Sequence, residues 1–149
     1  MVRVFVKKLN PSVRLPSYKT SGASGMDIMA FIEKPIELKP GKSCLIPTGL
    51  SVSFSKEYEI QIRPRSGLAA KNNISVLNTP GTIDSDYRGE LKIILFNHGS
   101  ENFMINNNDR VAQIVLSPII KMELEEINEL PKTIRGEGGF GSTGKWSTV

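Results

Sequence analysis

The chain has 149 residues, of which 39% are hydrophobic and 23% are charged, a composition typical of one soluble globular domain. No apolar run approaches the roughly 20 residues of a membrane-spanning helix, so no membrane partner is expected. The formal net charge is +4, but no basic stretch is interleaved with aromatic residues, and no nucleic-acid partner is expected either.

The dominant pattern along the chain is an alternation of apolar and polar residues, which predicts strands with one buried face. The alternating segments are residues 2–6, 50–54, 58–62 and 120–124. Residues 91–96 and 111–116 form denser apolar runs, as expected of strands covered on both faces. Turn signals such as Pro40-Gly41 and Pro80-Gly81 separate the segments. Many short strands with frequent turns predict an all-β barrel or sandwich.

One short helix is predicted within this all-β pattern, at residues 66–71. Ser66 is the expected N-cap, and Asn72 and Asn73 suit its end because asparagine tolerates the left-handed conformation. The amino end of a helix attracts anions, and Arg65 would add a cation beside it. Capping alone explains the same residues, so this segment does not decide between an anion site and a plain helix start.

The most polar segment, residues 78–89, lies between two expected strands and predicts the loop of a β-hairpin. Turn formation explains its Pro-Gly pair. It does not require Asp84, Asp86, Tyr87 and Arg88 to occur together. A carboxylate in such a loop would be placed to act as a general base towards water.

The cysteine and the histidine predict no chemistry of their own. Cys44 is the single cysteine, which excludes an internal disulfide and favours a reducing, cytoplasmic location. It lies in an apolar run, so a buried and unreactive thiol is expected. His98 is expected in a surface turn, and without a second histidine or a cysteine pair no transition-metal site is predicted.

From Arg135 onward the chain is rich in glycine, and such a segment cannot form a core of its own. Gly136, Gly138 and Gly141 match a dinucleotide-binding fingerprint, but that fingerprint requires a βαβ unit. A near match to a P-loop fails because Trp146 stands where a hydroxyl residue is required. Glycine N–H groups flanked by cationic and hydroxyl donors still suit phosphate oxygens, with a disordered tail as the alternative.

Five separated stretches resemble the five motifs of the homotrimeric dUTPases, in the same order. They read ASGMD at 23–27, RPRSGLA at 63–69, NTPGTIDSDYRG at 78–89, DRVAQ at 109–113 and RGEGGFGSTG at 135–144. Each motif is short, but five in order span most of the chain. The resemblance implies a jelly-roll-like distorted β-barrel with one short helix. It also implies a homotrimer in which each active site is assembled from three chains.

The resemblance implies hydrolysis of dUTP to dUMP and pyrophosphate, which keeps uracil out of DNA and supplies dUMP for thymidylate synthesis. Asp84 would activate the attacking water, Asn78 would read the uracil edge, and Tyr87 would pack on the deoxyribose and exclude a 2′-hydroxyl. The expected catalytic residues are Asp84, Gln113 and Arg135. The expected substrate-binding residues are Arg65, Ser66, Gly67, Asn78, Gly81, Ile83, Tyr87, Phe140, Gly141, Ser142 and Thr143.

The resemblance also implies a magnesium ion on the three phosphates, bound largely through water. Asp27 is then an outer-shell or structural carboxylate. A barrel at residues 1–134 would carry a flexible arm at 135–149 that closes over the active site, with Phe140 stacking on uracil.

Two other functions remain open from the sequence. A dCTP deaminase shares this fold and trimer, but it requires a glutamate where this chain has Ile94, three positions before Asn97. A non-catalytic nucleotide-binding regulator would be expected to lack Asp84 or the glycine-rich tail, and both are present. The presence of Asp84 and of the glycine-rich tail favours triphosphate hydrolysis.

Overall fold

The computed structural model describes residues 1–139, which contain eleven strands and one helix. No helix in this part of the chain is long and apolar enough to cross a membrane. The elements are β1 (Phe5–Lys8), β2 (Met26–Met29), β3 (Ile36–Leu38), β4 (Ser43–Pro47), β5 (Leu50–Ser53), β6 (Tyr58–Arg63), α1 (Ser66–Asn72), β7 (Ile74–Val76), β8 (Gly81–Ile83), β9 (Lys92–Asn97), β10 (Phe103–Ile105) and β11 (Arg110–Pro118).

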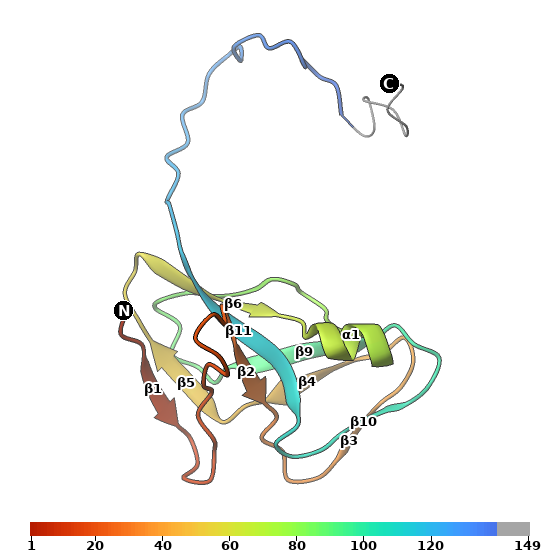
Figure 1. The fold of residues 1–149 in the computed structure, drawn as a ribbon. Coiled ribbons are helices and arrows are strands. Elements are labelled where there is room, and N and C mark those ends of the chain that lie inside the picture. Colours follow the sequence, from red (N-terminus) through yellow and green to blue (C-terminus); the bar gives the residue numbers. More distant parts are fainter. Residues whose placement is uncertain (140–149) are drawn as a thin grey trace.

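The main body consists of two antiparallel sheets, one with the strand order β2-β11-β6-β8 and one with the order β4-β9-β7 (Figure 1). Two shorter antiparallel pairs, β1-β5 and β3-β10, lie on opposite sides of this body (Figure 1). The expected all-β, jelly-roll-like fold with one short helix is confirmed.

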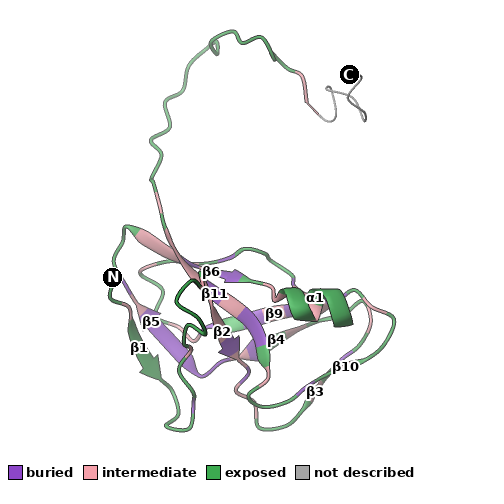
Figure 2. Ribbon diagram, viewed as in Figure 1, coloured by how far each residue is buried: buried purple, intermediate pink, exposed green. Residues whose placement is uncertain are grey.

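The core follows from the alternation in the sequence. Ile60 and Ile62 on β6 are each 3% exposed, and Ile93 and Leu95 on β9 are fully buried. Burial is concentrated on the inner strands, whereas the short helix is exposed (Figure 2). Each such side chain stabilises the fold by about 1.5–3 kcal/mol relative to an exposed position, so the paired sheets form a firm support for the polar loops.

The polar segment after β7 is only partly the hairpin loop that the sequence predicts. β7 pairs with β9, with Val76 opposite Leu95, as a hairpin requires. Between them, however, β8 crosses to the other sheet and pairs with β6, with Gly81 opposite Ile62. Gly81 is buried and Ile83 is half-buried, so this short alternation is enough to extend the sheet beyond β6.

Two predicted strands differ in the structure. β1 begins at Phe5 rather than at residue 2, and residues 120–124 form no strand. β11 ends at Pro118, and the chain then leaves the barrel (Figure 1). Ile120 is 97% exposed and Met122 81% exposed, and no strand within residues 1–139 pairs with this segment. Alternation predicts a strand only where a neighbouring strand can complete the hydrogen bonds.

The N-cap of the helix lies one residue earlier than predicted. Arg65 is the N-cap, with an extended backbone, and its carbonyl accepts the first helical hydrogen bond from the Ala69 N–H at 3.0 Å. Ser66 is therefore the first helical residue, and the prediction that it caps the helix is wrong. The predicted end is confirmed, since Asn73 adopts the left-handed conformation with φ 55°.

Candidate functional site

An ionic cluster joins three separate elements at one end of β6. Asp27 on β2 accepts a hydrogen bond from Arg65 Nε at 3.0 Å through Oδ1, and one from Arg110 Nη1 at 3.1 Å through Oδ2. Arg65 Nη1 also donates to the carbonyl oxygen of Arg110 at 3.0 Å. The Asp27 and Arg65 side chains are 20% and 23% exposed, so the pairs orient the guanidinium groups more than they stabilise the fold.

A β-bulge sets the pairing that builds this cluster. The register between β11 and β2 shifts between Arg110 and Ala112, so that Gln113 lies opposite Asp27. On its other side Gln113 lies opposite Arg63 of β6, and its Nε2 donates to the Pro64 carbonyl at 3.1 Å. Gln113 therefore lies between Asp27 of β2 and the segment that leads into α1.

The resulting surface suits an anion with several oxygen atoms. Arg65 is fixed by two contacts, and a guanidinium has five N–H donors in a planar fork, so donors remain for an anion. Ser66 and Gly67 follow at the exposed start of α1. The structure thus brings together five of the predicted residues, Asp27, Arg65, Ser66, Gly67 and Gln113.

The second group of predicted residues lies on β8 and in the loop that follows it. Asp84 is exposed, and its carbonyl accepts a hydrogen bond from the Tyr87 N–H at 3.1 Å, which closes a turn. Arg88 Nη1 donates to the Ser85 carbonyl at 2.7 Å and to the Tyr87 carbonyl at 3.0 Å. The loop is therefore held by its own main chain, and the Asp84 carboxylate is presented to solvent.

The loop is also anchored to the turn between β4 and β5. Glu90 Oε1 accepts a hydrogen bond from the Gly49 N–H at 2.8 Å, and the Tyr87 hydroxyl donates to the Glu90 carbonyl at 3.1 Å. At the other end of β8, a Cβ atom added at Gly81 would lie 3.2 Å from Asn78 Nδ2. Glycine at this position leaves room for the Asn78 side chain against the sheet.

The two groups lie at opposite ends of β6 within one chain. Ile83, the residue before Asp84, pairs with Ile60, whereas Gln113 pairs with Arg63. Measured along the strands, Asp84 is therefore about four residues, or about 13 Å, from Gln113. They also lie on opposite sides of β6, next to β8 and next to β11. One chain does not bring the carboxylate and the anion-binding group into a common pocket.

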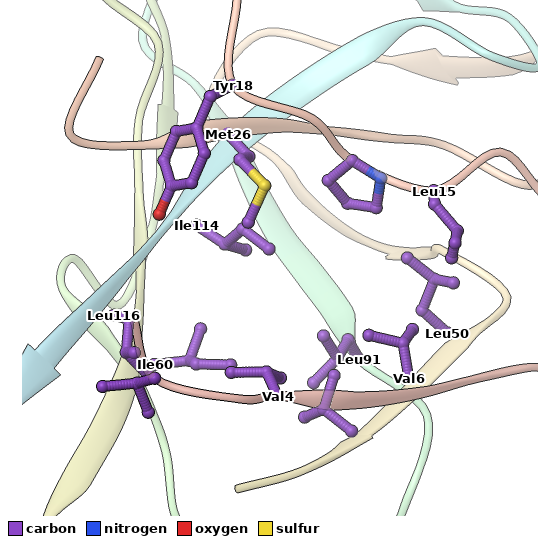
Figure 3. A pocket seen from close by; sticks show the side chains of 13 residues that line it. Val4, Val6, Leu15, Tyr18, Met26, Leu50, Ile60, Leu91, Ile114 and Leu116 are labelled. Carbon is purple, nitrogen blue, oxygen red and sulfur yellow. The ribbon is translucent and has the colours of Figure 1, made fainter. Parts of the chain in front are cut away.

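Cavities in the described residues agree with this division. Asp84 and Asp86 line a cavity of about 270 Å³ together with Lys56, Glu59 and Lys121, a mixed-charge surface. An apolar cavity of about 290 Å³ lies under the N-terminal segment, where side chains such as those of Val4 and Ile114 line it (Figure 3). None of the predicted site residues lines the apolar cavity, and it offers no group for catalysis.

Among residues 1–139, no three His, Cys, Asp or Glu side chains lie close enough together to hold a metal ion. Both oxygens of the Asp27 carboxylate already accept hydrogen bonds from arginine. Burial raises the pKa of the half-buried Cys44 thiol, which lowers its thiolate fraction at neutral pH and supports the prediction of an unreactive cysteine. His98 is exposed, as predicted, with Nε2 2.7 Å from Ser75 Oγ.

The C-terminal segment lies away from both groups. Arg135 is exposed, its Nε donates to the Gly138 carbonyl at 2.7 Å, and the chain here extends away from the barrel (Figure 1). The predicted site residues Phe140, Gly141, Ser142 and Thr143 lie outside the described residues, as does Trp146.

Two residues of the site were not predicted from the sequence. Arg110 lies within the matching segment DRVAQ, but its contact with Asp27 depends on the bulge, which leaves no mark in the composition. Glu90 follows the polar loop directly, and its link to Gly49 joins segments 41 residues apart. In the sequence, the role of Glu90 is indicated only by its place directly after a matching motif.

Comparisons with known proteins agree on one family. A profile of the dUTPase family matches residues 12–144. A deoxyuridine 5'-triphosphate nucleotidohydrolase of Treponema denticola is 58% identical over 137 residues, which cover 92% of this chain and 95% of the relative. One of Bdellovibrio bacteriovorus is 55% identical over 143 residues, covering 95% and 96%. The structure of a Staphylococcus bacteriophage 80alpha dUTPase with dUPNHPP superposes with a TM-score of 0.81 at 26% identity, covering 95% of this chain and 98% of that one.

Proposed function

Because this chain belongs to the dUTPase family and hydrolyses dUTP to dUMP and pyrophosphate, we propose that the groups at the two ends of β6 catalyse the reaction in separate copies of the chain. The observation that carries the proposal is the separation of Asp84 from Arg65 and Gln113 within one chain. During the reaction the attacking water at the α-phosphorus must contact Asp84, while the phosphates contact the Arg65 cluster. A complete site therefore needs the Asp84 loop of one copy beside the Arg65 cluster of another.

Asp84 acts as the general base in this proposal. Its carboxylate accepts a proton from water as the water oxygen attacks the α-phosphorus. The bond from the α-phosphorus to the oxygen that bridges to the β-phosphorus then breaks, and its electron pair leaves with pyrophosphate. The exposure of Asp84 and the closed turn from Asp84 to Tyr87 support this role, because they present the residue to solvent on an ordered main chain.

The same loop recognises the nucleoside. Asn78 and the main chain of β8, including Gly81 and Ile83, read the uracil edge by hydrogen bonds, which reject a base with mismatched donors. Tyr87 packs on the deoxyribose and excludes a 2′-hydroxyl. The position of Asn78 against Gly81 and the anchoring of Tyr87 on Glu90 support these roles.

Phosphate binding belongs to the other end of β6. Arg65, Ser66, Gly67 and Gln113 hold the triphosphate, and the Asp27–Arg110 contacts keep the Arg65 fork in place. The arm from residue 135 onward closes over the bound nucleotide, with Arg135, Ser142 and Thr143 on the phosphates. Phe140 and Gly141 cover the base. Closure excludes water and strengthens the electrostatic stabilisation of the transition state.

Magnesium fits this site as an ion held by the nucleotide. The described residues offer no carboxylate cage, and both oxygens of Asp27 are engaged by arginine, so protein groups would contact the ion through water. When bound to the triphosphate, the ion supplies positive charge that offsets the charge of the phosphate oxygens. Asp27 is thus an outer-shell or structural carboxylate.

The assembly that satisfies these requirements is a homotrimer with shared active sites. Closed rotational symmetry gives each copy the same neighbours, so three equivalent sites form. The segment after β11 supports an assembly, because its large apolar side chains need cover that the described part of the same chain does not give. The exposed apolar residues are Ile120, Met122, Leu124, Ile127, Leu130 and Ile134. A cytoplasmic location is part of the same proposal, and the single cysteine supports it because a reducing compartment needs no disulfide framework.

Pyrophosphate release with magnesium, measured for dUTP, dCTP, UTP and dTTP at equal concentration, tests the proposed function. Release from dUTP alone, with formation of dUMP, supports the base and sugar selectivity described above. Ammonia from dCTP would indicate a deaminase, and binding of dUTP without turnover would indicate a regulator. Both of those outcomes contradict the proposal.

A further inference from the structure

The ring of Tyr87 lies directly against the main chain of Gly89. A Cβ atom added at Gly89 would lie 2.5 Å from Cζ and 2.9 Å from Cε2 of Tyr87. Carbon atoms in contact are normally about 3.5–4.0 Å apart, so no side chain at residue 89 is compatible with this ring position. The three atoms nearest to the added Cβ all belong to Tyr87.

Backbone conformation does not explain glycine at this position. Among the described residues the glycines with positive φ are Gly41, Gly49 and Gly136, and Gly89 is not one of them. An alanine at residue 89 would therefore not be strained by a positive φ, and the three atoms that lie nearest to its Cβ are those of the ring. Restoring an ordinary carbon–carbon separation moves the ring by about 1 Å.

The hydroxyl end of the same ring is also hydrogen-bonded. The Tyr87 hydroxyl donates to the Glu90 carbonyl at 3.1 Å, and the Glu90 carboxylate accepts from the Gly49 N–H at 2.8 Å. The Tyr87 N–H bonds the Asp84 carbonyl in the same turn. The hydroxyl end of the ring is therefore placed by its hydrogen bond to the Glu90 carbonyl and by the space that the missing side chain of Gly89 leaves for it.

We propose that Gly89 is a positioning residue for sugar selection, because its missing side chain sets where the Tyr87 ring stands against the deoxyribose. The inference rests on the proposed role of Tyr87. A ring displaced by about 1 Å no longer closes the space that a 2′-hydroxyl would occupy, and this lowers the selectivity for dUTP over UTP. One atom in a tight pocket changes selectivity by about 10-fold or more.

The test is the ratio of kcat/KM for dUTP to kcat/KM for UTP in four proteins: the natural chain, Gly89→Ala, Tyr87→Ala and the double variant. The expected result is a fall of about 10-fold in Gly89→Ala and no further fall when the same change is made beside Tyr87→Ala. Gly22→Ala is the matched control, because no heavy atom lies within 4 Å of its added Cβ. Its ratio should be that of the natural chain.

Separate outcomes identify which part is wrong. An unchanged ratio in Gly89→Ala, together with a lowered ratio in Tyr87→Ala, would overturn the inference about Gly89 alone. An equal loss with and without the Tyr87 ring would also overturn it, because Gly89 would then act by another route. An unchanged ratio in Tyr87→Ala would overturn the proposed role of Tyr87 and the inference with it. Thermal unfolding of each variant shows whether the fold is retained.

Discussion

The two ends of β6 are built by different means. At the Arg65 end, charged side chains from three elements are joined by ion pairs, with Asp27 between two arginines. At the Asp84 end, main-chain hydrogen bonds and the Glu90 anchor hold the loop, and the carboxylate is left exposed. The separation of the two ends keeps Asp84 from pairing with Arg65 within its own chain.

The largest effect is expected from removing the base at the Asp84 end. Asp84→Asn keeps the shape of the side chain but cannot take a proton, so kcat should fall by about 10²–10⁴-fold while dUTP binding is retained. Steady-state turnover and equilibrium binding measure the two quantities. Asp86→Asn, two residues further along the same loop, is the matched control and should retain activity; comparable kcat in the two variants would contradict the assignment.

Deleting residues 135–149 tests what the arm contributes apart from the two ends of β6. Loss of the phosphate contacts proposed for Arg135, Ser142 and Thr143 should lower kcat by about 10²-fold, the effect of removing a transition-state donor. Because residues 135–139 lie beyond the barrel, light scattering should give the same number of chains per assembly as for the full chain. A normal single-turnover rate would show that the arm does not complete the site.

A smaller effect is expected from loosening the Arg65 end. Asp27→Asn leaves one acceptor oxygen for two guanidinium groups, so Arg65 is less well held and KM for dUTP should rise by about 10-fold, more than kcat falls. The free energy of unfolding should change by no more than about 1 kcal/mol, since the pairs are partly exposed. Glu33→Gln, an exposed carboxylate between β2 and β3, is the control, and an equal KM in both variants would rule out this role of Asp27.

The smallest effect is expected from Arg110→Lys. The Arg110 carbonyl accepts a hydrogen bond from Arg65, and the Arg110 side chain donates to Asp27, which also holds Arg65. Arg110→Lys keeps a cation near Asp27 and leaves the carbonyl contact in place, so KM should rise by only about 2–3-fold. Arg110→Ala should have a larger effect, of the size expected for Asp27→Asn. The same KM for the lysine and alanine variants would show that the charge at this position does not orient Arg65.

Strand alternation predicted those elements in which the pattern alone decides the structure. β5 and β6 lie where the alternation at 50–54 and 58–62 places them, and Asn73 ends the helix as its tolerance of positive φ allows. Alternation does not identify the partner of a strand. For that reason the pattern does not predict the transfer of β8 to the other sheet, and it predicts a strand at residues 120–124 that the described chain does not pair.

The candidate site shows the same division. The five matching segments contain the residues at both ends of β6. These residues can be predicted from the sequence because each segment is recognised from its own few residues. Their separation depends on the pairing of Ile83 with Ile60 and of Gln113 with Arg63, which is set by long-range register. The bulge at Arg110 and the space that Gly89 leaves for Tyr87 are likewise invisible until the fold is known.

Subunit mixing between Asp84→Asn and Arg65→Ala tests most directly whether each site combines both ends of β6 from different copies. Each variant alone should be inactive, and trimers formed by refolding an equal mixture should regain about one quarter of the natural activity, since each site draws its two groups from two randomly chosen neighbours. Recovery of this size is the predicted result. A mixture as inactive as its components, although shown to contain mixed trimers, would place both groups of each site in the same chain and contradict the account.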